Sequence, residues 1–226
     1  MQARIENSEQ LFEQLKSSLS AARLTRYIKE CGDDSKRAFE LYYWNTKASQ
    51  SLYVLVQVWE VALRNRLNSF LCWKYNKNWP FDEKHVVRQL QRADKARVQE
   101  AIVRQRQLRG TQKVSTDSVV ADLSAGFWVS LLGKSYDVPY AWRYNLARVV
   151  PHRKELQRDD VSRMCDSLLD LRNRIAHHEP IYHLPLRQRW DDANVLLEGM
   201  CPAAHQFASI VCDFKDVMDS KPKLQL

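Results

Sequence analysis

Residues 39–75, FELYYWNTKASQSLYVLVQVWEVALRNRLNSFLCWKY, decide the fold. They lie in a run from residue 36 to residue 75 that contains neither glycine nor proline, the two residues that most disfavour a helix interior. The run therefore predicts one long helix, or two helices in line, of the kind that forms the spine of a helical bundle. The sequence NKNWPF, residues 76–81, is predicted to end it.

The rest of the chain has the same helical character. With 5 glycines and 7 prolines in 226 residues, it has few of the turns that an all-β sandwich or barrel requires. Apolar residues at helical spacing predict further helices, which we place at 8–20, around 24–31, and at 83–109, 118–123, 159–178, 185–200 and 202–219. We predict an all-α protein of one domain, residues 1–226.

Side chains that favour helix ends mark several of these boundaries. We expect N-terminal caps at Ser8, within 33–35, at Ser115 or Thr116, and at Asp159 or Asp160. Pro180 should stop the helix before it.

Charge favours a polyanionic partner. The chain carries 35 basic and 27 acidic residues, a net charge of +8, which fits RNA, DNA, an anionic membrane surface, or simply a basic soluble protein. The segment 83–110 concentrates this charge, so we expect a solvated helix that projects from the core, either as an exposed charged face or as an arm that faces RNA. Its candidate RNA-binding residues are Arg88, Arg92, Lys95, Arg104 and Arg106.

The cysteines and the N-terminus indicate a cytoplasmic protein. The 5 cysteines are odd in number and form no C-x-x-C pair, which is typical of reduced thiols. Residues 1–20 are amphipathic and carry acidic side chains, unlike a signal or transit peptide. No stretch approaches the ~20 apolar residues that span a bilayer, so we expect no membrane partner.

Side chains that can bind phosphate or transfer protons are concentrated in LRNRIAHHEPIYH, residues 171–183. On a helix, Asn173 and His177 are neighbours four residues apart on one face, and the long side chain of Arg172 can reach the same groove. Cleavage of RNA without a metal needs a cation for the pentacovalent phosphate and a group that moves a proton near neutral pH. Arg172 suits the first role and His177 the second, while Asn173 can orient His177 or bind a phosphate oxygen. Two chains meeting about a two-fold axis would make a fuller site.

Three blocks of the sequence resemble a known family. The string RNRIAH, from Arg172 to His177, is similar to the R-x4–6-H signature of the HEPN superfamily. LRNRIAHHEPIY resembles the C-terminal motif of Abi-like (abortive infection) proteins of that superfamily. Residues 42–65 resemble their N-terminal motif, and 122–132, DLSAGFWVSLL, their central Gly-Phe-Trp motif. The blocks stand in the family's order and cover about residues 40–185.

The resemblance implies an α-helical HEPN bundle and a metal-independent endoribonuclease without a cofactor. It further implies a composite site at a homodimer interface and a role in bacterial defence, in which RNA cleavage halts the growth of a phage-infected cell. Arg172 and His177 would be the catalytic pair, and Asn173 a supporting polar residue. Related nucleases include toxins of toxin–antitoxin pairs, and some Abi proteins associate with a small noncoding RNA, so an antitoxin or such an RNA is a candidate partner.

Simpler interpretations remain open for the same residues. Arg172 could cap the helix end or pair with Asp170 or Glu179. His178 at a helix C-terminus would stabilise the helix dipole, and Arg174 would lie in the stripe beside it. A metal cluster of His177, His178, Glu179 and His183 fits no standard zinc spacing.

Other residues are open to two interpretations as well. Glu60 and Arg64 could form an ion pair within their helix or, with Asn65, support the groove of Arg172. Several aromatic side chains could stack on bases or belong to the core, namely Trp44, Tyr53, Trp59, Phe127 and Trp128. Finally, the chain could be a non-catalytic module that binds RNA or a nucleotide.

Overall fold

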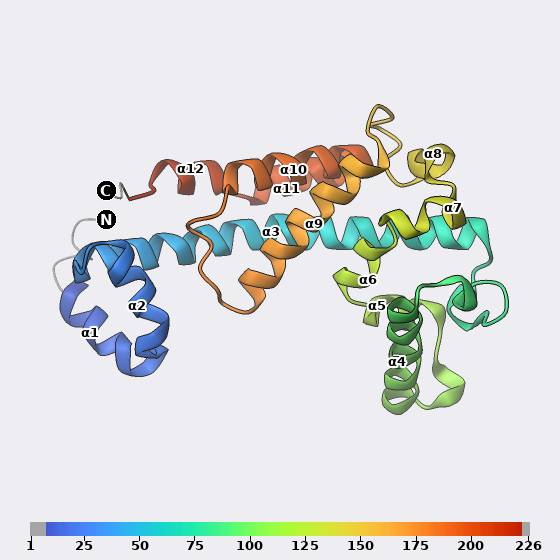
Figure 1. Ribbon diagram of the computed structural model, residues 1–226, viewed down its shortest axis with the longest axis horizontal. Coiled ribbons are helices and arrows are strands. Elements are labelled where there is room, and N and C mark those ends of the chain that lie inside the picture. The colour runs from blue at the N-terminus through green and yellow to red at the C-terminus, as the bar shows by residue number, and fades with distance from the viewer. Residues whose placement is uncertain (1–7, 223–226) are drawn as a thin grey trace.

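A computed structural model describes residues 8–222, and the ends of the chain, 1–7 and 223–226, lie outside it. All regular structure in the described part is helical, as predicted. Helix α3, Ser35–Lys74, runs the length of the molecule as its spine (Figure 1). The carboxylate of Asp34 caps it by accepting a hydrogen bond from the backbone N–H of Arg37, with N···O at 3.0 Å. The prediction of one long helix is confirmed.

The N-terminal helices pack against the start of α3. These are α1, Ser8–Leu19, and α2, Ala21–Glu30. The buried ring of Tyr27 on α2 meets the rings of Tyr42 and Tyr182, with centroids 5.2 Å apart in both pairs. These contacts join the α1–α2 hairpin to α3 and to the loop that follows α9. Ser8 was expected to cap α1, but it is itself the first described helical residue.

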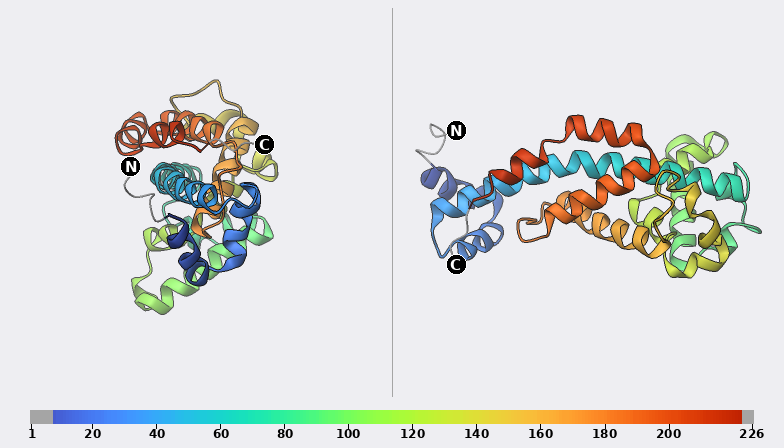
Figure 2. Two further views of the ribbon diagram at one scale, coloured as in Figure 1. Left: turned by 90° about the vertical axis from the view of Figure 1, so that its left-hand side faces the viewer. Right: turned by 90° about the horizontal axis from the view of Figure 1, so that it is seen from above.

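The C-terminal helices pack against α3. They are α9, Arg158–Ala176; α10, Leu186–Met200; α11, Pro202–Val211; and α12, Phe214–Asp219. Helix α9 crosses α3 obliquely, and α10, α11 and α12 run alongside it (Figures 1 and 2). The prediction of one last helix over 202–219 is wrong. The backbone of Cys212 is extended and Phe214 turns inward to stack on Trp190, at a centroid distance of 6.2 Å, so burial of Phe214 accompanies the break.

The cap of α9 also differs from the prediction. Gln157, and not Asp159 or Asp160, occupies the cap position. Asp160 is the third helical residue, and its carboxylate accepts the N–H of Gln157 at 3.2 Å, which closes a capping box. Asp159 and Asp160 therefore lie in the first turn of α9, after the cap and not at it.

Along the chain, a series of helices and turns connects the end of α3 to the start of α9. They are η2, Trp79–Phe81; η3, Val87–Gln89; α4, Arg92–Arg109; η4, Thr111–Lys113; α5, Thr116–Asp122; α6, Ala125–Ser130; η5, Lys134–Tyr136; α7, Asp137–Tyr140; α8, Trp142–Asn145; and η6, Leu146–Arg148. Ser115 caps α5, as predicted. The helix predicted at 118–123 begins earlier, at Thr116, and ends at Asp122; Leu123 and Ser124 are extended and separate it from α6.

Helix α4 begins later than predicted. Residues 83–91 form turns and η3 instead of helix, because Val86, Val87 and Leu90 are all buried in the core. Beyond residue 91, α4 runs away from the long axis of α3 (Figure 1). It is not fully solvated, since one face packs on α5 and buries Asp94 and Val98 among others.

Most of the aromatic side chains considered for base stacking belong to the core. Trp44, Trp59, Phe127 and Trp128 are buried, whereas Tyr53 is 49% exposed. No helix among the described residues is both long and apolar enough to cross a bilayer.

Candidate active site at the end of α9

Helix α9 ends in a tight turn within residues 171–183, the segment that contains the candidate catalytic side chains. The N–H of His178 bonds to the carbonyl of Ile175 at 3.0 Å, and the N–H of Glu179 bonds to the carbonyl of Arg174 at 2.8 Å. This pair of bonds is a Schellman motif, which requires a left-handed residue after the cap. His178 takes that position with φ 56°, where glycine is the usual residue. The turn therefore directs the chain away from the helix directly after His177, the cap.

Two side chains from distant segments hold this turn in place. The side-chain oxygen of Asn45 on α3 accepts the backbone N–H groups of Ile181 and Tyr182, at 2.8 and 3.0 Å. The guanidinium of Arg23 on α2 donates to the carbonyl of His178 at 2.6 Å. Asn45 and Arg23 were not singled out from the sequence, because contacts over such separations leave no local signal.

Arg172 is held between α9 and α3. Its Nε donates to Oε2 of Glu60 at 3.1 Å, and the two side chains are 37% and 28% exposed. The other guanidinium nitrogens form no hydrogen bond with any described residue, so they remain available to a ligand. The suggested partners of Arg172, Asp170 and Glu179, bind Arg174 instead, at 3.2 and 3.1 Å.

Asn173 and His177 are exposed. The backbone N–H of His177 bonds to the carbonyl of Asn173 at 2.9 Å, which keeps the two residues one helical turn apart as expected. Within residues 8–222 their side chains make no hydrogen bond, so both are free to contact a substrate.

The predicted supporting residues divide between two faces of α3. Glu60 pairs with Arg172 and not with Arg64, so the expected ion pair within the helix is absent among the described residues. Nε of Arg64 is buried without a partner there. Asn65 lines a groove on another side of the helix, about 140° from Glu60 at 3.6 residues per turn. The structure therefore does not bring Asn65 to Arg172.

A cleft of about 460 Å³ adjoins the turn, between α1, α2 and α3. Arg23, Asn45, His178 and Glu179 are among the residues that line it. His177 is not among them and faces solvent beside the cleft. A phosphate at the end of α9 would thus meet cationic and neutral polar groups, with one carboxylate.

Burial and charged neighbours shift the pKa of two side chains near this turn. Burial and the positive charges of Arg26 and Arg174 lower the pKa of His183. Burial opposes ionisation of Asp170, but its hydrogen bonds and charge interactions with Arg189 and Arg174 prevail and lower its pKa. In the described part of the chain no three His, Cys, Asp or Glu side chains gather as metal ligands.

The predicted RNA-binding residues lie on η3 and α4. Arg88 is on η3, and the other four are on α4. Lys95 pairs with Glu83 at 3.7 Å and Arg104 with Asp122 at 2.9 Å. The remaining three are exposed and have no ion-pair partner among residues 8–222, namely Arg88, Arg92 and Arg106. These three are the stronger candidates for phosphate contacts.

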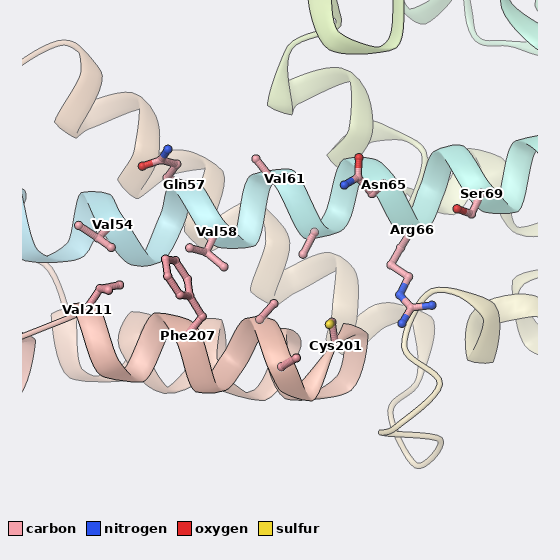
Figure 3. A pocket seen from close by; sticks show the side chains of 13 residues that line it. Val54, Gln57, Val58, Val61, Asn65, Arg66, Ser69, Cys201, Phe207 and Val211 are labelled. Carbon is pink, nitrogen blue, oxygen red and sulfur yellow. The ribbon is translucent and has the colours of Figure 1, made fainter. Parts of the chain in front are cut away.

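A larger groove lies between α3 and α11, with a volume of about 880 Å³ (Figure 3). Valine and alanine side chains line most of it, together with Phe207. Its single charged lining residue, Arg66, donates to the carbonyl of Met200. Apart from Arg66 and Cys201, the lining contains no group that titrates, so this groove is suited to apolar contact and not to proton transfer.

The chain matches no model of a known protein family, no curated protein and no solved structure. The support for the candidate site comes from its own residues and from the sequence blocks that resemble Abi-like proteins.

Proposed function

We propose that the protein is a metal-independent endoribonuclease of the HEPN type, with its centre at Arg172, Asn173 and His177. The main supporting observation is the end of α9, where a half-exposed Arg172 is fixed by Glu60 next to two exposed polar side chains with no competing partners in the described chain. The three sequence blocks that resemble Abi-like proteins support the same reaction.

The proposed reaction is internal transfer at a phosphodiester. His177 takes the proton from a ribose 2′-hydroxyl, whose oxygen attacks the adjacent phosphorus while the bond to the 5′-oxygen breaks. The leaving oxygen takes a proton from water or from the imidazolium that His177 has become, and the products are a cyclic phosphate and a 5′-hydroxyl. Arg172 stabilises the charge on the pentacovalent phosphate through the nitrogens that Glu60 leaves free. Asn173 orients His177 or binds a phosphate oxygen.

We further propose a cytoplasmic role in bacterial defence, in which a bound noncoding RNA or an antitoxin restrains the nuclease. The net charge of +8 and the unpaired arginines of η3 and α4 support an RNA partner. Toxicity on expression tests this role. Wild-type protein should arrest bacterial growth and His177→Ala should not, while equal growth of the two strains would contradict the proposal.

A homodimer is proposed to complete the site. The α3–α11 groove faces away from Glu60, with Val58 about 160° from it round α3, so pairing through that groove would keep the two sites apart. We therefore place the partner copy against the exposed side of Asn173 and His177. Mixing inactive Arg172→Ala and His177→Ala proteins tests this, because a shared site regains activity in mixed dimers. No recovery from mixed dimers would reject the composite site.

Purified protein and labelled RNA in the presence of EDTA test the nuclease itself. We expect cleavage by wild type and loss of cleavage in Arg172→Ala and in His177→Ala, with unchanged circular dichroism. Cleavage unaffected by both substitutions would reject the assignment, and cleavage abolished by EDTA alone would reject the metal-independent reaction.

The second candidate function is a module that binds RNA without cutting it. Arg88, Arg92 and Arg106 favour this alternative, because they are exposed and have no ion-pair partner in the described part of the chain. It predicts nucleic acid that co-purifies with the protein and dissociates as salt is raised. Absence of bound nucleic acid together with salt-independent behaviour would argue against it.

A further inference from the structure

An aromatic and cationic surface lies at the opposite end of α9, around α8 and the loop that follows it. A cleft of about 410 Å³ opens there, and Tyr144, which is 78% exposed, is among the residues that line it. Four cationic and two acidic side chains share this lining, namely Arg143, Arg153, Lys154, Arg158, Asp137 and Asp159. The cleft belongs neither to the candidate active site nor to α4.

The two carboxylates of this cleft share one guanidinium, that of Arg158. Arg158 binds Asp137 through two nitrogens, at 2.8 and 3.0 Å, and also binds Asp159 at 2.7 Å. Arg153 is occupied in a similar way by Glu198 and Glu155, both outside the cleft lining.

Two cations of the cleft remain without an acidic partner. The structure shows no carboxylate bound to Arg143 or Lys154 among the described residues, and both side chains are exposed. These two charges are therefore available to an anionic ligand. The guanidinium of Arg143 lies over the exposed ring of Tyr144, 5.8 Å from its centroid, so the cleft contains an aromatic–arginine pair.

The backbone that carries these side chains is firmly anchored. Ala141 adopts a left-handed conformation, φ 48°, which turns the chain between α7 and α8. Trp142 is buried, its indole N–H donates to the carbonyl of Leu131 at 3.0 Å, and its ring lies 4.7 Å from that of Phe70. The next two residues, Arg143 and Tyr144, therefore point outward from a fixed support, which lowers the entropy lost when they bind a ligand.

A second aromatic–arginine pair lies close along the chain. Leu146 and Ala147 line the cleft, and the next residue, Arg148, places its guanidinium 3.5 Å from the ring centroid of Trp73. Trp73 is 53% exposed at the end of α3. Aromatic and guanidinium planes that alternate with free cations are the surface on which unpaired bases stack and phosphates bind.

We propose that this cleft binds a single-stranded segment of RNA. Arg143 and Lys154 hold its phosphates, and a base stacks on Tyr144. The inference rests on the proposed RNA partner but not on cleavage. Because α9 has 19 residues, or about 28 Å at 1.5 Å per residue, the bound segment would lie well away from the scissile bond at His177.

Binding of a fluorescent single-stranded RNA of mixed sequence tests the proposal, measured in a His177→Ala background so that the probe stays intact. The double variant Arg143→Gln/Lys154→Gln should lower affinity about tenfold at moderate salt and reduce the salt slope by about 1.4, or ~0.7 per lost phosphate contact. Tyr144→Ala should weaken binding about tenfold, whereas Tyr144→Phe should bind like the parent.

Matched controls separate local from general effects. Lys29→Gln/Lys36→Gln removes the same charge from exposed lysines near the other end of α3, and Tyr43→Ala removes a tyrosine that is 47% exposed on α3. Both should bind RNA nearly as the parent does.

Each outcome has a distinct meaning. Equal binding by the parent, the double variant and Tyr144→Ala would overturn the cleft while leaving an RNA partner in place. Absence of binding by the parent would overturn both. Binding that depends on these residues in a protein that cuts no RNA would reject the nuclease and support the cleft.

Discussion

The two sides of α3 differ in chemistry. Toward α9 and the loop that follows it, Asn45 accepts two backbone N–H groups and Glu60 holds Arg172. Toward α11 the side chains are mostly valine and alanine, as at Val58 and Ala62. One helix thus positions a polar segment with one face and offers apolar contact with another, because 3.6 residues per turn separate the two sets of side chains.

The largest effect should come from His177 on the polar side. We expect His177→Ala to slow RNA cleavage about 10²–10⁴-fold, since it removes the group that transfers the proton. The side chain is exposed and without a partner in the described chain, so the midpoint of thermal unfolding should change little. Cleavage rates under single-turnover conditions measure the effect.

The apolar side supplies the control for this prediction. Phe207→Ser alters a residue that is 56% exposed in the groove and should leave the cleavage rate near that of wild type. A loss of cleavage in Phe207→Ser as large as in His177→Ala would erase the distinction between the two sides.

The next largest effect should be on stability, at Asn45. Asn45→Ala leaves the buried N–H groups of Ile181 and Tyr182 without an acceptor, and should lower the free energy of unfolding by about 2–4 kcal/mol. Thr46→Ala is the matched control, because that hydroxyl is exposed and bonds only within its own helix. Urea unfolding measures both, and equal stability of the two variants would show that Asn45 does not hold the loop.

Local sequence predicted the helices wherever caps and periodicity agree. Asp34 and Ser115 cap helices as expected, and α9 ends before Pro180. The failures lie where tertiary burial overrides local pattern. Val86 and Val87 are drawn into the core and delay α4, and Phe214 turns inward at the break between α11 and α12.

The candidate site was predictable in its residues but not in its contacts. The spacing of Arg172, Asn173 and His177 is visible in the sequence, and the structure leaves Asn173 and His177 exposed. The partner of Arg172 is Glu60, 112 residues away. The sequence suggested Asp170 or Glu179 as ion-pair partners and left support of Arg172 by Glu60 as one of two alternatives. Local spacing cannot report a contact that depends on how two helices cross.

A smaller stability effect is expected at His178. Its left-handed backbone is strained for a residue with a Cβ atom, so His178→Gly should raise the free energy of unfolding by about 0.5–1 kcal/mol. His178→Ala keeps the Cβ and should show no such gain. Thermal unfolding measures both, and destabilisation by glycine would mean that the imidazole, and not the backbone, determines the turn.

The smallest effect concerns pH and His183. Because the pKa of His183 is lower in the folded chain, its contribution to stability is complete above about pH 6.5, the ordinary value, and is lost as the pH falls toward the folded pKa. His183→Gln should reduce the loss of stability on going from pH 7 to pH 5. An unchanged pH profile would show that burial and the charges of Arg26 and Arg174 do not lower the pKa of this imidazole.

The central claim is that Arg172 and His177 act on the same phosphodiester. Single-turnover cleavage by Arg172→Ala, His177→Ala and the double variant tests it most directly. Residues that work as a unit give a double variant scarcely slower than the slower single variant, and this is the result we predict. Losses that multiply in the double variant, or cleavage that survives both substitutions, would contradict the account.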